Sequence, residues 1–269
     1  MKAFLRHFSF EFVNGVRNKN LLLLTYLLPV GFYLMMGFVM VEINPLFLEH
    51  MIPAMVIFGM LSAALLGIPD PLVTSRENGV FRSYKINGVP SLTILLMPAL
   101  STIIHLVIVT AIITFSAPVL FDAPSPVNWG WYGLIFLAAS VAVVGLSILI
   151  GVISKTSRMT VLWSQLVYLP SMMLGGLMIP YSLLPESVQR LARILPATLA
   201  MNAFNGLAMG GVSDFSAWGS VATLVVGGVL AFILALFLFS WDSRNTTRRA
   251  HPLLGLAALL PYLLQVFFN

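Results

Sequence analysis

Long apolar stretches alternate with short polar segments along almost the whole chain. The hydrocarbon core of a bilayer, about 30 Å thick, needs roughly 20 residues of apolar helix to cross it. Prolines and glycines inside such stretches, for example Pro29 and Gly31, are tolerated where neighbouring helices satisfy the freed backbone groups. The pattern therefore predicts an all-α integral membrane protein with six transmembrane helices. The expected spans are residues 21–41, 51–73, 91–120, 130–153, 160–179 and 218–241.

The segment before the first span has a helical pattern of a different kind. Leu5, Phe8, Phe12 and Val16 recur at helical spacing, and charged residues occupy the rest of the circumference. An amphipathic helix of this type lies in the headgroup region of a membrane and contacts the lipids there. We expect residues 1–19 to form an N-terminal interfacial helix.

Residues 180–214 are apolar but too broken to form a simple span. Pro180, Pro185 and Pro196 divide this segment, and its middle part, 185–195, is amphipathic. Irregular backbone is tolerated at membrane depth only where protein covers it. We therefore predict an outer segment between spans five and six that is interfacial or re-entrant.

The chain ends with an apolar tail, residues 253–268, which Pro261 interrupts. As a helix its 16 residues would extend about 24 Å, which is short for a membrane crossing. Two interpretations stay open, an interfacial or re-entrant tail and a short seventh span.

Composition supports the membrane assignment and limits the domain organisation. Hydrophobic residues make up 59% of the chain, charged residues make up 9%, and the mean hydropathy is +0.98. No polar stretch exceeds about 35 residues, whereas a small soluble domain needs roughly 50, so residues 1–269 are expected to form a single transmembrane domain. The chain has no cysteine, which excludes disulfides and thiolate metal sites.

The positions of the basic residues predict the orientation, because Lys and Arg concentrate in the cytosolic loops of membrane proteins. With the N-terminus inside, 12 of the 14 basic residues lie in cytosolic segments, and the outer segments hold Arg190 and Arg193. We therefore expect a multi-pass protein of the cell membrane with both termini in the cytosol. Since the basic residues flank apolar spans and form no continuous face, no nucleic-acid partner is expected. The cytosolic set is Lys2, Arg6, Arg17, Lys19, Arg76, Arg82, Lys85, Lys155, Arg158, Arg244, Arg248 and Arg249.

Two groups of short motifs, one in the polar segment 74–90 and one in residues 175–196, resemble those of a known family. The motifs of the first group are Arg76-Glu77-Asn78-Gly79, Tyr84-Lys85 and Gly88-Val89-Pro90. The motifs of the second group are Gly175-Gly176, Pro180, Leu184-Pro185 and Pro196. Together they resemble the ABC-2 type transporter permeases, which are the membrane subunits of one class of ABC exporters. The resemblance extends to the number of spans, the orientation and the total length.

The resemblance implies that segment 74–90 contains a cytosolic coupling helix, docked in a groove of a separate ATP-binding subunit. ATP and Mg²⁺ would then bind to that partner, and this chain would bind no cofactor. The sequence agrees in having no GxxxxGK[ST] phosphate-binding motif. The family also implies a second permease subunit, in a homodimer or a heterodimer. The residues assigned to ATPase coupling are Arg76, Glu77, Gly79, Arg82, Tyr84, Lys85 and Gly88.

Four polar residues within or beside the expected spans are candidates for a substrate path, namely His105, Gln165, Asn202 and Asn205. Each is either a substrate contact or a hydrogen-bonding group between helices. The short outer loops and apolar spans favour a hydrophobic or amphipathic cargo, such as a drug, an antibiotic or a lipid-like molecule. A lipid-linked polysaccharide exporter is the alternative within the same fold, and an ion-coupled secondary transporter is the alternative from a different class.

No enzymatic activity is expected of this chain. Its four histidines are scattered over different levels of the expected bundle, and neither an H-E-x-x-H nor a G-x-S-x-G motif occurs. We therefore assign no residue to catalysis or to metal binding.

Overall fold

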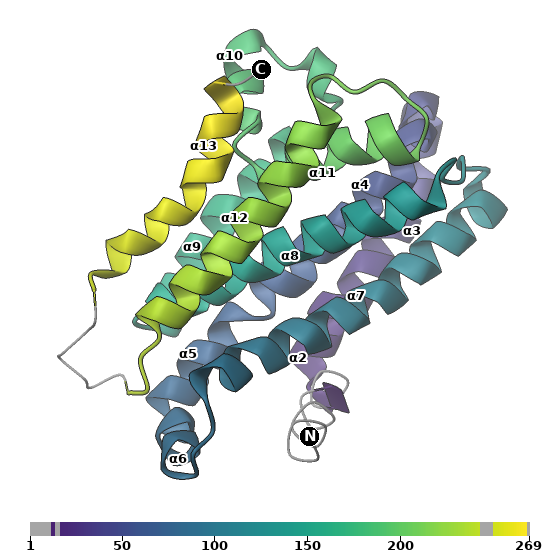
Figure 1. Cartoon of the computed structure of the whole chain (residues 1–269). Helices are drawn as coiled ribbons and strands as arrows, with labels where there is room; N and C mark the ends of the chain where they lie inside the picture. Colours follow the sequence, from purple (N-terminus) through teal and green to yellow (C-terminus); the bar gives the residue numbers. More distant parts are fainter. Residues whose placement is uncertain (1–11, 14–16, 243–249, 268–269) are drawn as a thin grey trace.

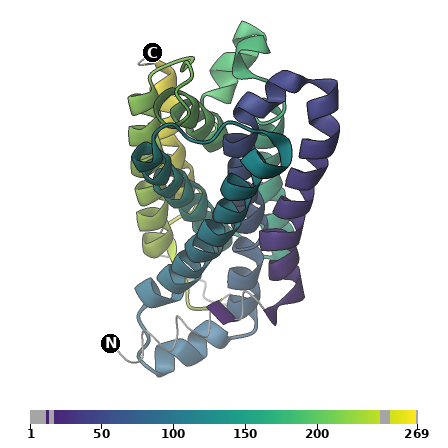
Figure 2. The ribbon, with the colours of Figure 1, turned by 90° about the vertical axis from the view of Figure 1, so that its right-hand side faces the viewer.

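Figure 1 shows the computed structural model of the chain, which describes residues 12–13, 17–242 and 250–267. Within these residues every regular element is a helix and no strand occurs, which confirms the all-α class. The helices pack as one elongated bundle (Figures 1 and 2). The expected interfacial helix, residues 1–19, falls mostly outside the described residues.

The bundle is built from long helices, several of which are continued by short π-helical or 3-10 segments (η). In the first half of the chain these are α2 (Lys19–Leu22), η1 (Leu23–Leu27), α3 (Leu28–Ile43), η2 (Pro45–Phe47), α4 (Leu48–Leu61), η3 (Ser62–Leu66), α5 (Pro69–Glu77), α6 (Val80–Ile86) and α7 (Ser91–Phe121). In the second half they are α8 (Trp129–Ile153), α9 (Ser157–Leu174), η4 (Tyr181–Leu183), α10 (Glu186–Ala192), α11 (Pro196–Ala203), η5 (Phe204–Ala208), α12 (Ala217–Leu238), η6 (Pro252–Leu259) and α13 (Leu260–Phe267).

Five helical stretches of the described chain are long and apolar enough to cross a membrane, and they match five of the six expected spans. The sixth, residues 160–179, corresponds to α9, which ends at Leu174 and contains Arg158 and Gln165. Because α9 is more polar than the five apolar stretches, the prediction that it crosses the membrane stays a prediction. The five stretches are Lys19–Ile43, Phe47–Glu77, Ser91–Phe121, Trp129–Ile153 and Ala217–Leu238.

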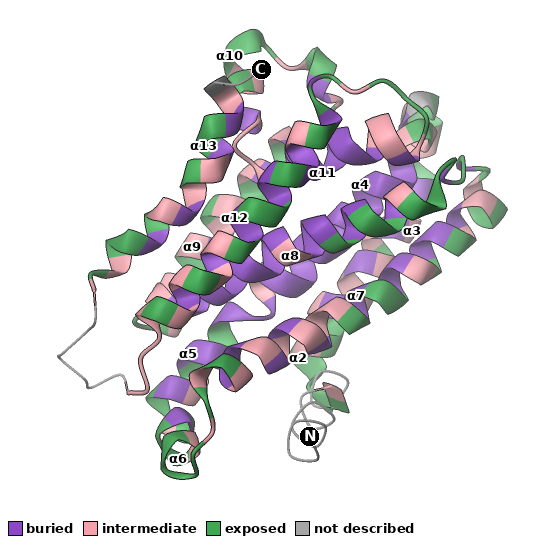
Figure 3. Cartoon of the chain, in the orientation of Figure 1, coloured by how far each residue is buried: buried purple, intermediate pink, exposed green. Residues whose placement is uncertain are grey.

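Two of these stretches form the interior of the bundle. In the stretch that contains α4, 94% of the most apolar window is buried, and in α8 the value is 89%. For Lys19–Ile43 it is only 28%, so this stretch lies at the periphery (Figure 3). Helices that are apolar on all sides are suited to a fully surrounded position.

Hydrogen bonds between side chains connect neighbouring helices across the apolar interior. The Tyr33 hydroxyl of α3 lies 2.8 Å from the Ser116 hydroxyl of α7, and Thr114 of α7 lies 2.6 Å from the hydroxyl of Tyr132 in α8. Ser62 at the start of η3 donates to the Leu24 carbonyl of η1 over 3.1 Å. Polar pairs of this kind contribute to helix association in lipid, where no hydrophobic force drives helices together.

The two short connections of interest lie at opposite ends of the bundle. The α5–α6 connection is at one end, and α10 is at the other (Figures 1 and 2). The expected coupling segment 74–90 contains the short helix α6, which begins at Val80, and α5 continues into this segment as far as Glu77, beyond the expected end of the second span. Segment 180–214 folds into η4, α10, α11 and η5, separated by the prolines that suggested a broken segment.

The C-terminal tail does not stay at one end of the bundle. It packs on α12 and runs beside it, so that the end of α13 lies near α10, opposite the α6 end (Figures 1 and 2). Tyr262 of α13 is fully buried against Gly227 of α12, and the Thr223 hydroxyl donates to Gln265 over 3.0 Å. This path fits the short seventh span, one of the two interpretations that the sequence left open, and the side of the membrane on which each terminus lies stays a prediction.

Glycines let α8 and α12 approach backbone to backbone. A Cβ atom placed on Gly145 of α8 would lie 2.4 Å from the Gly228 carbonyl oxygen of α12. A Cβ on Gly228 would lie 2.6 Å from the carbonyl group of Val141. No side chain larger than a hydrogen atom fits between the two helices at this level, because the obstructing atoms are backbone.

We predict that Gly145→Ala lowers the free energy of unfolding of the purified chain by about 1–3 kcal/mol, which is the usual cost of overpacking a tight contact. Gly133→Ala in the same helix is the matched control, since a Cβ there meets nothing within 4 Å. Alanine also has the higher helix propensity, so the control should hold or gain stability. Equal melting temperatures for the two variants in detergent would refute the close contact.

Candidate functional site

Helix α6 is a short amphipathic helix bracketed by two glycines. Gly79 precedes it with a φ of 74° and Gly88 follows it with a φ of 72°, both in the left-handed region that glycine adopts without strain. These glycines reverse the chain between α5 and α7.

Arg76, which the sequence assigned to ATPase coupling, is buried, with 5% of its surface exposed. Its guanidinium donates to the Val152 carbonyl over 2.9 Å and to the Ser154 carbonyl. Both carbonyls lie at the C-terminal end of α8, where helix carbonyls lack partners and a positive charge is favourable. A direct contact between Arg76 and an ATPase does not fit this geometry. Its position instead ties α5 to α8.

Two contacts attach α6 to the end of α12. The buried ring of Phe81 packs on Phe239, with 5.4 Å between ring centroids. Beside it, the partly exposed guanidinium of Arg82 pairs with Asp242 over 2.5 Å. Sequence reasoning selected Arg82 but missed Phe81, Phe239 and Asp242. The only available signal was a lone phenylalanine in a strongly polar segment.

Other residues of α5 and α6 at this end of the bundle are exposed. Glu77, Lys85 and Ile86 are exposed, and 80% of the Ile86 surface is accessible. Ile86 is a single exposed apolar side chain next to the basic Lys85 at the C-terminal end of α6. Tyr84 is half-buried and points to the bundle, where it lines a cavity.

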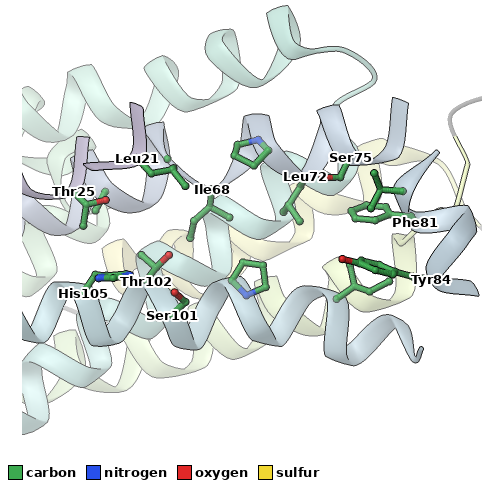
Figure 4. A pocket seen from close by; sticks show the side chains of 16 residues that line it. Leu21, Thr25, Ile68, Leu72, Ser75, Phe81, Tyr84, Ser101, Thr102 and His105 are labelled. Atoms are coloured by element: carbon green, nitrogen blue, oxygen red, sulfur yellow. The ribbon is translucent and has the colours of Figure 1, made fainter. Parts of the chain in front are cut away.

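A cavity of about 130 Å³ extends from α6 into the bundle, and we refer to it as the α6-side cavity. Figure 4 shows Phe81 and Tyr84 at one end of its lining and His105 of α7 at the other. Ser101 and Thr102 of α7 lie between them, so hydroxyl groups follow the cavity along its length.

His105 closes this cavity at the level of η1. Its Nδ1 lies 2.6 Å from the Tyr26 hydroxyl, and the Phe12 ring stacks on the imidazole at 4.4 Å. Its Nε2 is buried and makes no hydrogen bond within the described residues. His105 therefore bonds between helices through one nitrogen, and its other nitrogen is enclosed by the packing.

A second cavity, of about 410 Å³, lies at the α10 end, and we refer to it as the α10-side cavity. It contains both Asn202 and Asn205 in its lining. The Asn202 amide is used within the protein, since it bonds to the backbone of Asp214 and Phe215 and to the Ser220 hydroxyl at 2.9–3.3 Å. Asn202 thus fixes the loop before α12, whereas Asn205 has a buried, unpartnered Oδ1.

The four expected substrate-path residues do not meet in one site. His105 lines the α6-side cavity, Asn202 and Asn205 line the α10-side cavity, and Gln165 of α9 lines neither. Among the described residues no group of acidic or histidine side chains is arranged to hold a metal ion. Sequence spacing could not reveal this separation, because it depends on how the helices pack.

Comparison with known proteins decides the class. The profile of the family described as ABC-2 type transporter matches residues 3–209. The chain belongs to the ABC-2 type transporter family. A relative from Bacillus subtilis (strain 168), named "Putative transport permease YvfS", is 22% identical over 232 residues, which cover 85% of this chain and 93% of the relative. No solved structure matches the chain.

The permease class agrees with the multi-pass helical fold and identifies the chain as a membrane transport subunit. The motif-based recognition from segments 74–90 and 175–196 is therefore confirmed at the level of the family. The functional roles assigned to individual residues stay predictions.

We predict that Arg76→Met destabilises the permease by about 2 kcal/mol or more, because buried carbonyls at the end of α8 lose charged donors. Arg82→Met is the matched control, since exposed ion pairs contribute about 0–1 kcal/mol. Thermal unfolding of both variants in the same detergent measures the difference. Equally small losses of stability in the two variants would contradict the buried, hydrogen-bonded position of Arg76.

Proposed function

We propose that this permease is the membrane-spanning subunit of an ATP-driven exporter for hydrophobic or amphipathic small molecules. A separate ATPase subunit would bind ATP and Mg²⁺, and a second permease subunit would complete the assembly. The observation that carries the proposal is helix α6 of an ABC-2 family member, with Ile86 exposed at its C-terminal end and Phe81 anchored in the bundle. Such a helix would offer exposed residues to a partner subunit, while the buried Phe81 would transmit movement to the bundle.

Transmission from α6 would use the contacts described above. A displacement of α6 by the ATPase acts on α12 through Phe81 and Phe239, and on α5 directly. Because Arg76 of α5 is bonded to the end of α8, the two central partners α8 and α12 would both respond. Packed helices have discrete arrangements, so a small shift at α6 can change the bundle at a distance.

The cargo class is inferred from the surfaces that the spans present. Their accessible residues are mostly Leu, Ile, Val and Phe, and few charged groups lie within them. Both cavities combine apolar walls with a few hydrogen-bonding side chains, which is the usual character of small-molecule sites. These features favour an amphipathic molecule over a strongly polar one.

For orientation we propose that the α6 end faces the cytosol and the α10 end faces outward. The absence of native cysteine permits a direct test by single-cysteine labelling. Asn78→Cys should resist a membrane-impermeant maleimide in intact cells and react after permeabilisation, whereas Ser187→Cys in α10 should react in intact cells. The reverse pattern would invert the proposed topology.

We predict that Glu77→Ala reduces ATP-driven export and permease-stimulated ATP hydrolysis by about tenfold, since a charge-assisted hydrogen bond is worth about 1.5–3 kcal/mol. Dye accumulation in cells and ATP hydrolysis by the copurified ATPase give the two readouts. Glu42→Ala, another exposed acidic residue, is the matched control and should behave as the unmodified chain. Normal export by Glu77→Ala would argue against coupling through this residue, and the lack of any copurifying ATPase would argue against the exporter as a whole.

A further inference from the structure

Three hydroxyl groups of the α6-side cavity are accessible and have no partner in the described part of the chain. They belong to Thr25 of η1 and to Ser101 and Thr102 of α7, which line this cavity. Within the described residues none of the three makes a hydrogen bond, and none is among the oxygens that are enclosed without a partner. Thr25 and Ser101 are nevertheless buried, with 7% and 5% of their surface exposed. Their hydroxyls therefore face the cavity.

These hydroxyls lie close enough together to bind one small group. Ser101 and Thr102 are consecutive in α7, about one turn before His105. On the facing helix, Tyr26 directly follows Thr25 and its hydroxyl lies 2.6 Å from His105 Nδ1. Figure 4 accordingly shows Thr25 on one side of the cavity and Ser101 and Thr102 on the other, all near His105.

The lining restricts the chemistry of an occupant. It includes no Asp, Glu, Lys or Arg, and a charge that is buried without a counterion costs several kcal/mol. A hydroxyl both donates and accepts hydrogen bonds, so the lining fits an uncharged group that carries hydroxyls of its own. A cavity of about 130 Å³ accommodates about six non-hydrogen atoms, which is the size of a glycerol group.

A groove of about 410 Å³ adjoins this cavity between η1, η3 and α9, and we refer to it as the α9-side groove. Leu21, Gly67 and Pro71 line both spaces. A Cβ atom on Gly67 would lie 3.5 Å from Leu21 Cδ2, so Leu21 packs on Gly67 and separates the groove from the cavity. Leu21 is only partly buried, and such side chains change rotamer readily. Rotation of this one side chain would join the two spaces.

The groove is suited to an alkyl chain. Leu23, Leu24, Leu66 and Val161 supply apolar surface in its lining. Leu23 and Val161 are 47% and 57% exposed, so the groove opens at the outer surface of the bundle. The polar residues of its lining are all exposed, namely Asn18, Asn20 and Asp70.

We propose that the α6-side cavity and the α9-side groove together bind one amphipathic molecule with an uncharged, hydroxylated head. The head bonds to Thr25, Ser101 and Thr102, and the alkyl chain lies in the groove. Leu21 is about one helical turn from Thr25, so a single small molecule can occupy both spaces. The inference rests on the proposed exporter function for its meaning, because it names a class of cargo. Its test requires neither ATP nor a partner subunit.

Three probes with the same six-carbon chain separate the head groups, namely 1-O-hexylglycerol, hexyltrimethylammonium and hexyl sulfate. Their binding to the purified full chain in zwitterionic nanodiscs is measured by saturation-transfer NMR, with empty nanodiscs as the background. Hexylglycerol should bind saturably, and the two charged probes should bind at least about tenfold more weakly. Equal binding of all three would show apolar partitioning only. No saturable binding of hexylglycerol would show a water-filled cavity, and either result overturns the proposal.

Variants of the cavity test the contacts of the head. Ser101→Ala and Thr102→Val each remove a hydroxyl at similar volume and should weaken hexylglycerol binding about threefold to tenfold. Because these hydroxyls have no partner within the described chain, the melting temperature without probe should hold. Thr110→Val is the matched control, since Thr110 is a buried threonine of the same helix that lines neither space. It should leave hexylglycerol binding unchanged.

Variants of the groove test the position of the chain. Val161→Trp places a large ring in the groove from an exposed position, so it should fold normally and weaken hexylglycerol binding at least about tenfold. Leu162→Trp, at the next position of α9, is the matched control, because Leu162 is 70% exposed and lies outside the groove lining.

Unchanged hexylglycerol binding in both cavity variants, or in Val161→Trp, would overturn the assignment. That outcome would leave the exporter function standing, whereas normal export by Glu77→Ala would leave this binding site standing.

Discussion

The backbone contact between α8 and α12 at Gly145 and Gly228 is the constraint on which the bundle depends. In lipid the surroundings of a helix are as apolar as the helix itself, so association relies on close packing and on paired polar groups. Small residues let these two helices meet at the shortest distance. α8 is surrounded as a result, and α4, α5, α7 and α11 take their positions around the pair.

Both ends of this helix pair carry the features that concern function. At one end, Arg76 bonds to the last carbonyls of α8 while Phe81 and Arg82 attach α6 to the end of α12. At the other end, Asn202 holds the loop that leads into α12. The same rigid pair therefore connects the proposed docking helix to the α10-side cavity. The two ends of the bundle are therefore connected through packed helices, and no single residue has to reach from one end to the other.

The two cavities share a structural device. The α6-side cavity is bordered by the π-helical segments η1 and η3, and the α10-side cavity is bordered by η5. A π-helical turn widens a helix and interrupts its regular packing, and such turns are frequent at functional sites. Here they leave space beside helices that are otherwise tightly packed. His105 and Asn205 each line one of these spaces.

The sequence alone determined the membrane class, the all-helical fold, five of the spans and the family, because apolar length and motif spacing are local properties. It also located α6, although Arg76 proved to be buried and the chain continued as α5 to Glu77. Only the tertiary structure decided that Asn202 is structural, that His105 and Asn205 belong to different cavities, and that the tail runs beside α12. These outcomes depend on which helices are neighbours, and an apolar helix has nearly the same pattern whether lipid or protein surrounds it. Contacts between distant segments, such as Gly145 with Gly228, carry that information.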